Sequence, residues 1–171
     1  MVAYRKRHRR PRHKLAVLFS SKTVEWSTPQ DFFDELNAEF GFDLDPCATV
    51  ENAKCARYFT MADNGLAQPW PGRVFMNPPY GRAVAAWMEK ASLSAQTTAE
   101  LVVCLVPART DTRWWHDYAM HGEVRLLRGR LKFGGASAAA PFPSALIIFR
   151  NGSGVSIATS DRYETDLEPA A

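Results

Sequence analysis

The pattern of apolar and polar positions divides the middle of the chain into short helices and strands. Four bulky apolar residues recur at helical spacing over residues 32–40, which predicts an amphipathic helix with one buried face. Thr28 precedes Pro29 at the start of this segment, so we expect the Thr28 side chain to cap the helix and Pro29 to occupy its first turn. Gly41 follows the last apolar position and should end the helix.

Five apolar or alternating runs have the length and composition of strands, at residues 42–45, 73–76, 101–106, 123–127 and 144–149. The third run is apolar without interruption, as is typical of a buried parallel strand. Further helices are predicted at residues 83–95 and around Trp114, Trp115 and Tyr118, so that strands and helices alternate. This order predicts an α/β fold with a mostly parallel sheet.

Two stretches have a less regular pattern. Residues 49–72 are mixed, with a short helix expected over residues 51–58 and a turn at residues 63–65. The connection at residues 134–143 is rich in Gly, Ala and Pro, so it is predicted to be a loop rather than part of the core.

Unusual polar residues follow four of the predicted strands. Asp45 closes the first strand, Asn77 follows the second and Arg109 follows the third. Arg130 and Lys132 come after the fourth. Because ligands of open α/β sheets bind outside the carboxyl ends of the strands, the sequence predicts a binding site at this edge.

Asn77-Pro78-Pro79-Tyr80 follows an apolar strand, and its two prolines forbid continuation of a strand or a helix. The Asn77 amide oxygen and the Pro78 carbonyl can both accept hydrogen bonds from one exocyclic amine, whose ring would stack on Tyr80. Accepting both amine hydrogens exposes the lone pair of the nitrogen. The amine of a base in duplex DNA is paired, so the base would have to be rotated out of the helix. Alternatively, the two prolines make a tight turn that Asn77 caps.

The chain carries a formal charge of +3, and this charge is unevenly distributed. The first 14 residues hold seven basic side chains and no acidic one, namely Arg5, Lys6, Arg7, Arg9, Arg10, Arg12 and Lys14. The remaining 14 basic and 18 acidic residues leave the rest of the chain with a charge of about −4. We therefore expect residues 1–20 to be a basic, disordered arm. The arm either contacts a polyanion or serves only as a solubilising tail.

Several classes of protein are excluded by other features. No run approaches the roughly 20 apolar residues of a membrane span, and residues 15–19 are too few for the apolar core of an export signal. Three cysteines without a CxxC pair indicate neither a disulfide framework nor a zinc site, so we expect a cytoplasmic location. One globular domain is expected at residues 21–152, followed by an acidic, Gly- and Ser-containing tail at residues 153–171.

Six short segments together resemble one family of enzymes. They are WSTP at 26–29, DLDPCA at 43–48, DNGL at 63–66, NPPY at 77–80, PARTD at 107–111 and GRLKF at 129–133. The ordered set resembles the phage-type DNA adenine-N6 methyltransferase (Dam) family over about residues 24–150. NPPY alone is shared with protein-glutamine and RNA methyltransferases. The resemblance implies a compact, partly reduced Rossmann-like fold for the methyltransferase domain at residues 21–152, with S-adenosyl-L-methionine as the cofactor.

The resemblance also implies where the cofactor binds. Thr28 and Pro29 would touch its methionine moiety, because a helix N-terminus suits a carboxylate, although Thr28 could be a plain helix cap. Asp45 would bind the methionine ammonium. The rest of this first cofactor loop would be Pro46, Cys47 and Ala48.

Other residues are implied for the cofactor adenine and the target base. Asp63 would accept a hydrogen bond from the cofactor adenine and Leu66 would pack on its face, unless Asp63 only forms a turn. Phe133 would enclose the target base opposite Tyr80, unless Phe133 is a core residue. The catalytic residues implied are Asn77, Pro78, Pro79 and Tyr80, with Asn77 also adjoining the cofactor.

DNA contacts are expected mainly from basic side chains. The residues assigned to DNA binding are Arg5, Arg7, Arg9, Arg10, Arg12, Arg109, Arg130 and Lys132, together with Phe133. Taken singly, the basic residues after the arm could equally be solvated surface positions.

The chain departs from fuller methyltransferases in two respects. A glycine-rich FxGxG loop is absent, and only 17 residue steps separate Pro46 from Asp63, where two complete strand–helix units need at least about 30 residues. Part of the sheet should therefore be compressed, and Glu51 is the remaining candidate for binding the cofactor ribose. We also expect no separate recognition domain, so that DNA contact should come from loops and the arm.

The activity implied is transfer of a methyl group from S-adenosylmethionine to the N6 amine of adenine in double-stranded DNA after base flipping. No metal is required, a monomer is expected, and the setting would be a bacteriophage or its host cytoplasm, with protection against restriction as the suggested purpose. The alternatives are an RNA or protein-glutamine N-methyltransferase and a catalytically silent nucleic-acid-binding module.

Overall fold

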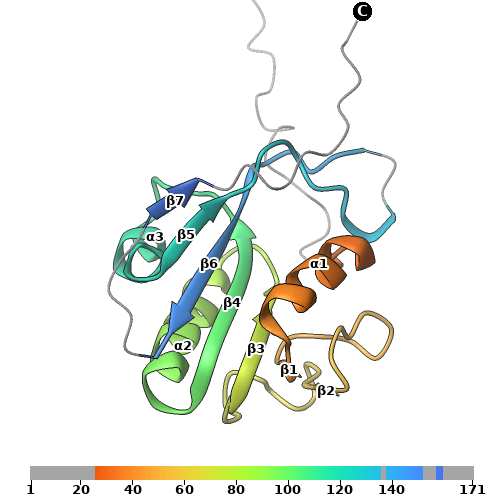
Figure 1. Cartoon of the computed structure of the whole chain (residues 1–171), viewed down its shortest axis with the longest axis vertical. Coiled ribbons are helices and arrows are strands. Elements are labelled where there is room, and N and C mark those ends of the chain that lie inside the picture. Colours follow the sequence, from red (N-terminus) through yellow and green to blue (C-terminus); the bar gives the residue numbers. More distant parts are fainter. Residues whose placement is uncertain (1–25, 136–137, 152–156, 160–171) are drawn as a thin grey trace, which may run out of the picture.

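The computed structural model describes residues 26–135, 138–151 and 157–159, which form helices packed on one mixed sheet. The described strands are β1 (Leu44–Asp45), β2 (Arg57–Tyr58), β3 (Gly72–Met76), β4 (Ala99–Pro107), β5 (Glu123–Leu126), β6 (Ser144–Arg150) and β7 (Ile157–Thr159). The described helices are α1 (Gln30–Phe40), α2 (Val84–Thr97) and α3 (Arg113–Asp117), with 3-10 turns η2 (Ala119–His121) and η3 (Phe133–Gly135). The strand order is β2-β1-β3-β4-β6-β5-β7 (Figure 1).

Most neighbouring strands in the sheet are parallel. β1 pairs in parallel with β2 and β3, β3 with β4, and β5 with β7. Of the described strands, only β6 is antiparallel to its neighbours, β4 and β5. The predicted α/β fold with a mostly parallel sheet is confirmed, and its topology is compatible with a Rossmann-like methyltransferase.

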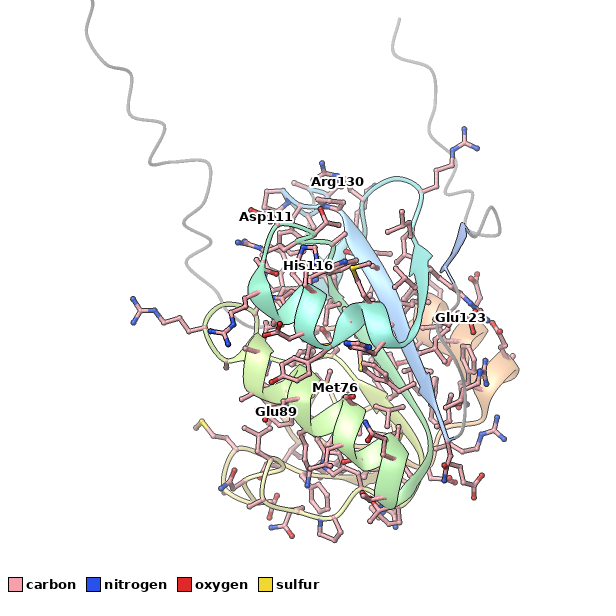
Figure 2. All side chains as sticks on the ribbon, turned by 90° about the vertical axis from the view of Figure 1, so that its left-hand side faces the viewer. Met76, Glu89, Asp111, His116, Glu123 and Arg130 are labelled. Atoms are coloured by element: carbon pink, nitrogen blue, oxygen red, sulfur yellow. The ribbon has the colours of Figure 1, made fainter. Side chains whose placement is uncertain are left out.

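Helices cover both faces of the sheet. Figure 1 shows α1 in front of the sheet and α2 and α3 behind it, and the turned view of Figure 2 places α2 and α3 on its near side. The ring of Phe33 in α1 packs edge-on against Phe75 of β3, with centroids 5.1 Å apart. The central strands β4 and β6 are buried along almost their whole length, so they form the middle of the core.

The helix α1 begins differently from the prediction. Thr28 does not cap it: Pro29 is the N-cap residue, with φ −55° and ψ 142°, and the helix has no side-chain capping hydrogen bond. The Thr28 hydroxyl instead accepts a hydrogen bond from Asn77, which a local pattern cannot reveal. The predicted stop is confirmed, because Gly41 has φ 62° and its N–H bonds to the Asn37 carbonyl at 2.8 Å.

The helix predicted over residues 51–58 is wrong. The Thr49 N–H donates to the Asn52 side chain at 2.6 Å, and the Lys54 N–H donates to the Asp45 carboxylate at 3.2 Å. These bonds compete with helix formation, and the chain turns before it forms β2. The two-residue strands β1 and β2 are the compressed part of the sheet.

Two segments after residue 130 contribute more than the sequence suggested. Ala140 is buried and Phe142 packs against the core, so the connection at 134–143 is a loop that helps to close the core. β7 lies inside the segment predicted as a tail, so the sheet continues beyond residue 152. The basic arm and the rest of the predicted tail lie outside the described residues. In the part of the chain that the structure describes, no helix is long and apolar enough to cross a membrane.

Candidate active site

A cavity of about 490 Å³ lies beside the carboxyl ends of β1 and β3. This volume is within the usual range of small-molecule sites. Four stretches of chain and one helix residue line it, at positions 26–28, 45–52 with 54, 60–62 with 64–65, 75 with 77–79, and 87. The structure thus brings together Thr28, Asp45 and Asn77, which are far apart in sequence.

Asp45 ends β1 and is a buried carboxylate in the cavity wall, with 5% of its surface exposed. It accepts hydrogen bonds from the N–H groups of Cys47 at 3.3 Å and Lys54 at 3.2 Å. Burial raises the pKa of Asp45 to about 6, although these two bonds and the Lys54 charge act in the opposite direction. The Lys54 ammonium itself donates to the side chain of Gln30. The charge of the Asp45 carboxylate is therefore only partly balanced by these groups, and a cationic ligand in the cavity could balance the rest.

Asn77 follows β3 and presents an amide to the same cavity. Its Nδ2 donates to the carbonyl oxygen of Trp26 and, at 2.9 Å, to the Thr28 hydroxyl. Its Oδ1 is buried and has no hydrogen-bond partner within the described residues. With both donors engaged, the amide offers a free acceptor to a ligand.

Pro78 and Pro79 line the cavity beside Asn77, but Tyr80 does not. Tyr80 is 7% exposed, and its hydroxyl donates to the Leu105 carbonyl at 3.4 Å. The ring of Tyr80 makes edge-on contacts with Phe133 and Phe142, at centroid distances of 6.1 and 5.5 Å. No gap for a base separates Tyr80 from Phe133 in this arrangement.

Asp63 and Leu66, assigned to the cofactor adenine from the resemblance, are not among the cavity-lining residues. The Asp63 carboxylate accepts hydrogen bonds from the Thr60 N–H at 2.8 Å and the Thr60 hydroxyl at 2.6 Å. These two bonds lower the pKa of Asp63. The geometry is that of the turn considered as the alternative, while Thr60, Asn64 and Gly65 from the same segment do line the cavity.

Gly65 lets two loops of the cavity wall approach each other. A Cβ atom at this position would lie 2.0 Å from the Pro46 carbonyl oxygen and 3.3 Å from the Trp87 ring. Trp87, on α2, also lines the cavity and was not predicted, because its helical spacing indicates only a core residue. Glu51, the ribose candidate, is an exposed residue of the wall.

Cys47 is a cavity residue whose thiol stays protonated. Burial, with the nearby Asp45 carboxylate, raises the pKa of Cys47 well above its ordinary value. Because the thiolate is the reactive form, this sulfur is a poor nucleophile at neutral pH. Within the described residues, no group of three or more His, Cys, Asp and Glu side chains could hold a metal ion.

The predicted DNA-binding cations within the described residues do not line the cavity. Arg109, Arg130 and Lys132 are exposed. Figure 2 shows Arg130 and Asp111 at one end of the molecule and Glu89 of α2 in the opposite half. Of the other residues assigned to DNA, Phe133 is 2% exposed, and the arginines at positions 5, 7, 9, 10 and 12 lie outside the described residues.

Curated relatives of this chain include one bacterial and two phage proteins. It is 44% identical over 64 residues to the protein named "Putative methyltransferase YfdM" of Escherichia coli (strain K12), covering 33% of this chain and 70% of that protein. It is 31% identical over 95 residues to the DNA N-6-adenine-methyltransferase of Escherichia phage T1, and 33% identical over 93 residues to that of Haemophilus phage HP1. These matches cover 54% and 53% of this chain, but only 39% and 53% of the two phage enzymes.

The comparison with family models covers most of the chain. The model described as DNA N-6-adenine-methyltransferase (Dam) matches residues 17–164, which include every described element from α1 to β7. The chain belongs to the DNA N-6-adenine-methyltransferase (Dam) family.

Proposed function

We propose that this protein transfers a methyl group from S-adenosylmethionine to the N6 amine of adenine in DNA. Family membership supports the reaction class, and the observation that carries the proposal is the buried, unpartnered Oδ1 of Asn77 within the described residues. Leaving such an acceptor unsatisfied costs about 1–3 kcal/mol, so a ligand that donates there removes a penalty of the empty site. The exocyclic amine of adenine is a donor of this kind.

The residues of the cavity fit the cofactor. S-adenosylmethionine supplies a methyl group on a positively charged sulfur, which an amine nitrogen can attack. Asp45 provides a buried carboxylate for the ammonium of the methionine moiety, and Thr28 provides a hydroxyl for its carboxylate. A cavity of about 490 Å³ is large enough for a ligand of nucleoside size.

Asn77 and Pro78 act on the amine in this proposal. The Asn77 Oδ1 and the Pro78 carbonyl accept its two hydrogens, which turns the nitrogen lone pair out of conjugation and towards the methyl group. The same acceptors stabilise the positive charge that develops on nitrogen as the N–C bond forms and the S–C bond breaks. The proton then leaves to solvent, and the remainder of the rate enhancement comes from alignment of the two reactants.

The target adenine must leave the duplex to reach Asn77. Tyr80 and Phe133 are in edge-on contact, so a base can lie between them only after the two rings separate. Arg109, Arg130 and Lys132 are exposed cations that can contact phosphates during this step.

The test is substitution of Asn77→Ala, with Asn151→Ala at the far end of β6 as the matched control. Methyl incorporation from labelled S-adenosylmethionine is measured side by side on DNA, RNA and a glutamine-containing protein. We expect wild type and Asn151→Ala to label DNA and Asn77→Ala to lose at least about 100-fold in rate, with an unchanged circular dichroism spectrum. Labelling of RNA or protein instead of DNA, or full activity of Asn77→Ala, would contradict the proposal.

Calorimetry with S-adenosylhomocysteine, which lacks the methyl group, separates an enzyme from a silent module. Binding to the wild type is expected. No heat at millimolar ligand would favour a nucleic-acid-binding protein without methyltransferase activity.

A further inference from the structure

The Asn77 amide is held by a segment that lies about 50 residues earlier in the chain. Both hydrogen-bond acceptors of Nδ2, the Trp26 carbonyl and the Thr28 hydroxyl, belong to the stretch that precedes α1. Thr28 is 5% exposed and forms no capping bond with the helix that it adjoins. Its buried hydroxyl therefore has another role than the one that the sequence pattern suggested.

The two acceptors differ in how strongly they orient the amide. A carbonyl oxygen only accepts, so turning the Asn77 amide over would place Oδ1 against the Trp26 carbonyl, with no hydrogen between the two oxygens. A hydroxyl can donate or accept, so the Thr28 hydroxyl alone tolerates either orientation. It favours one orientation only when its own hydrogen is engaged elsewhere.

The hydrogen of the Thr28 hydroxyl is available to a ligand. Within the described residues, the one hydrogen bond of this hydroxyl is the bond that it accepts from Asn77. Thr28 lines the same cavity as Asp45 and Asn77. An anionic group bound there would take the hydroxyl hydrogen and leave only lone pairs facing Nδ2.

We propose that Thr28 is a positioning residue that couples the two ligands of the site. Its hydroxyl donates to the carboxylate of the bound cofactor, can then only accept from Asn77, and so holds Oδ1 in the direction of the target amine. The proposal rests on the proposed function, because it requires both a cofactor and an adenine. Coupling of this kind is reciprocal, so cofactor should tighten DNA binding by the same factor by which DNA tightens cofactor binding.

Thr28→Val removes the hydroxyl and keeps the shape of the side chain. We expect kcat to fall about 2- to 12-fold, the value of one neutral hydrogen bond, because the Trp26 carbonyl still biases the amide. The Kd for S-adenosylhomocysteine should rise about tenfold or more, because the lost bond goes to a charged group. Thr28→Ser, which restores the hydroxyl, should recover most of both losses.

The matched control is Thr98→Val, at the end of α2. Thr98 also forms one hydroxyl hydrogen bond, to the Trp70 carbonyl at 3.2 Å, but it does not line the cavity. A general effect of losing a threonine hydroxyl would appear in this variant as well. We expect its kcat and its cofactor affinity to match those of the wild type.

The decisive experiment measures coupling directly, by the Kd for an unmethylated DNA duplex with and without saturating S-adenosylhomocysteine. We expect the ligand to tighten DNA binding at least fivefold in wild type, Thr28→Ser and Thr98→Val, and less than twofold in Thr28→Val. At saturating ligand, the side-chain amide signal of Asn77 in nitrogen-15 NMR spectra should shift more in the wild type than in Thr28→Val.

The outcomes separate the two proposals. A wild type that neither binds S-adenosylhomocysteine nor methylates DNA would overturn the proposed function. An active wild type whose Thr28→Val variant keeps the fivefold coupling, or in which Thr28→Ser fails to restore it, would overturn the role of Thr28 and leave the methyltransferase assignment intact.

Discussion

Replacing Asp45 by Asn tests whether the buried carboxylate destabilises the protein when no ligand is bound. The carboxyl group is 5% exposed, and burial raises its pKa from 3.8 to about 6. A difference of about two units corresponds to about 3 kcal/mol of free energy between the protonated and ionised forms. The folded protein therefore carries a penalty of up to about 3 kcal/mol whenever Asp45 is ionised without a cationic partner.

Because the pKa of Asp45 is raised in the folded state, the free energy of unfolding depends on pH. Below the unfolded pKa of 3.8, the group is protonated in both states and contributes nothing. As the pH rises to about 6, the unfolded state loses its proton before the folded state, so the free energy of unfolding falls. Above that range the penalty is constant. Asp45→Asn cannot ionise, so its free energy of unfolding should lack this decline.

Urea unfolding of the free protein between pH 3.5 and 8 measures the difference directly. We expect the free energy of Asp45→Asn, relative to wild type, to rise by up to about 3 kcal/mol between pH 4 and 6.5 and to be flat above that. Its absolute offset also includes the loss of one acceptor for the N–H groups of Cys47 and Lys54. The change with pH is therefore the quantity to compare. Asp43→Asn, at an exposed position outside the cavity wall, is the control.

Ligand affinity should show the complementary behaviour. The wild type should bind S-adenosylhomocysteine more weakly as the pH falls below about 6, because protonation removes the charge that attracts the ammonium. Asp45→Asn should bind more weakly at neutral pH and show little change between pH 5 and 7. Two results would refute the assignment of Asp45 as a destabilising, ligand-binding carboxylate. One is a free energy of unfolding that depends on pH in the same way in wild type and Asp45→Asn. The other is equal affinity of the two proteins for S-adenosylhomocysteine at pH 8.

One further substitution, with its control, and one deletion test other parts of the molecule. Gly65→Ala places a Cβ 2.0 Å from the Pro46 carbonyl oxygen, so it should lower the free energy of unfolding by about 1–3 kcal/mol and weaken S-adenosylhomocysteine binding in calorimetry. Gly41→Ala, where the added atom meets nothing within 4 Å, should affect unfolding alone, and equal loss of affinity in both variants would contradict a cavity effect. Deleting residues 1–14, outside the described residues, should weaken DNA binding and reduce its salt slope by up to about 6, with unchanged cofactor affinity. An unchanged salt slope would mean that the arm is only a tail.

Much of the fold follows from the sequence because its elements are strongly periodic or continuously apolar. The segments at residues 73–76, 83–95, 101–106 and 144–149 correspond to β3, α2, β4 and β6. Prediction failed between residues 49 and 58, where the side chain of Asn52 and the carboxylate of Asp45 capture backbone N–H groups. Such bonds depend on where a distant strand places its side chains, and periodicity carries no information about this.

The candidate site, like the fold, could be predicted from the sequence only in part. Asp45 and Asn77 are both predicted at the site because both follow strands. The structure brings them to one cavity because β1 and β3 are neighbouring parallel strands. Trp87 was not predicted, because a tryptophan at helical spacing is equally typical of a core. Asp63 was assigned from its motif, while its carboxylate bonds to Thr60, three residues away, which the sequence allowed only as the alternative.

The two features that best indicate a ligand are both departures from ordinary packing rules. Asp45 is an ionisable group buried without a full charge partner, and the Oδ1 of Asn77 is a buried acceptor without a donor in the described chain. Together they destabilise the empty protein by several kcal/mol, from about 3 for the carboxylate and about 1–3 for the amide oxygen. Natural folds retain such penalties mainly at functional sites. In the proposed function the cationic ammonium of the cofactor relieves the first penalty and the neutral amine of the target adenine relieves the second, so each ligand that binds should also stabilise the fold.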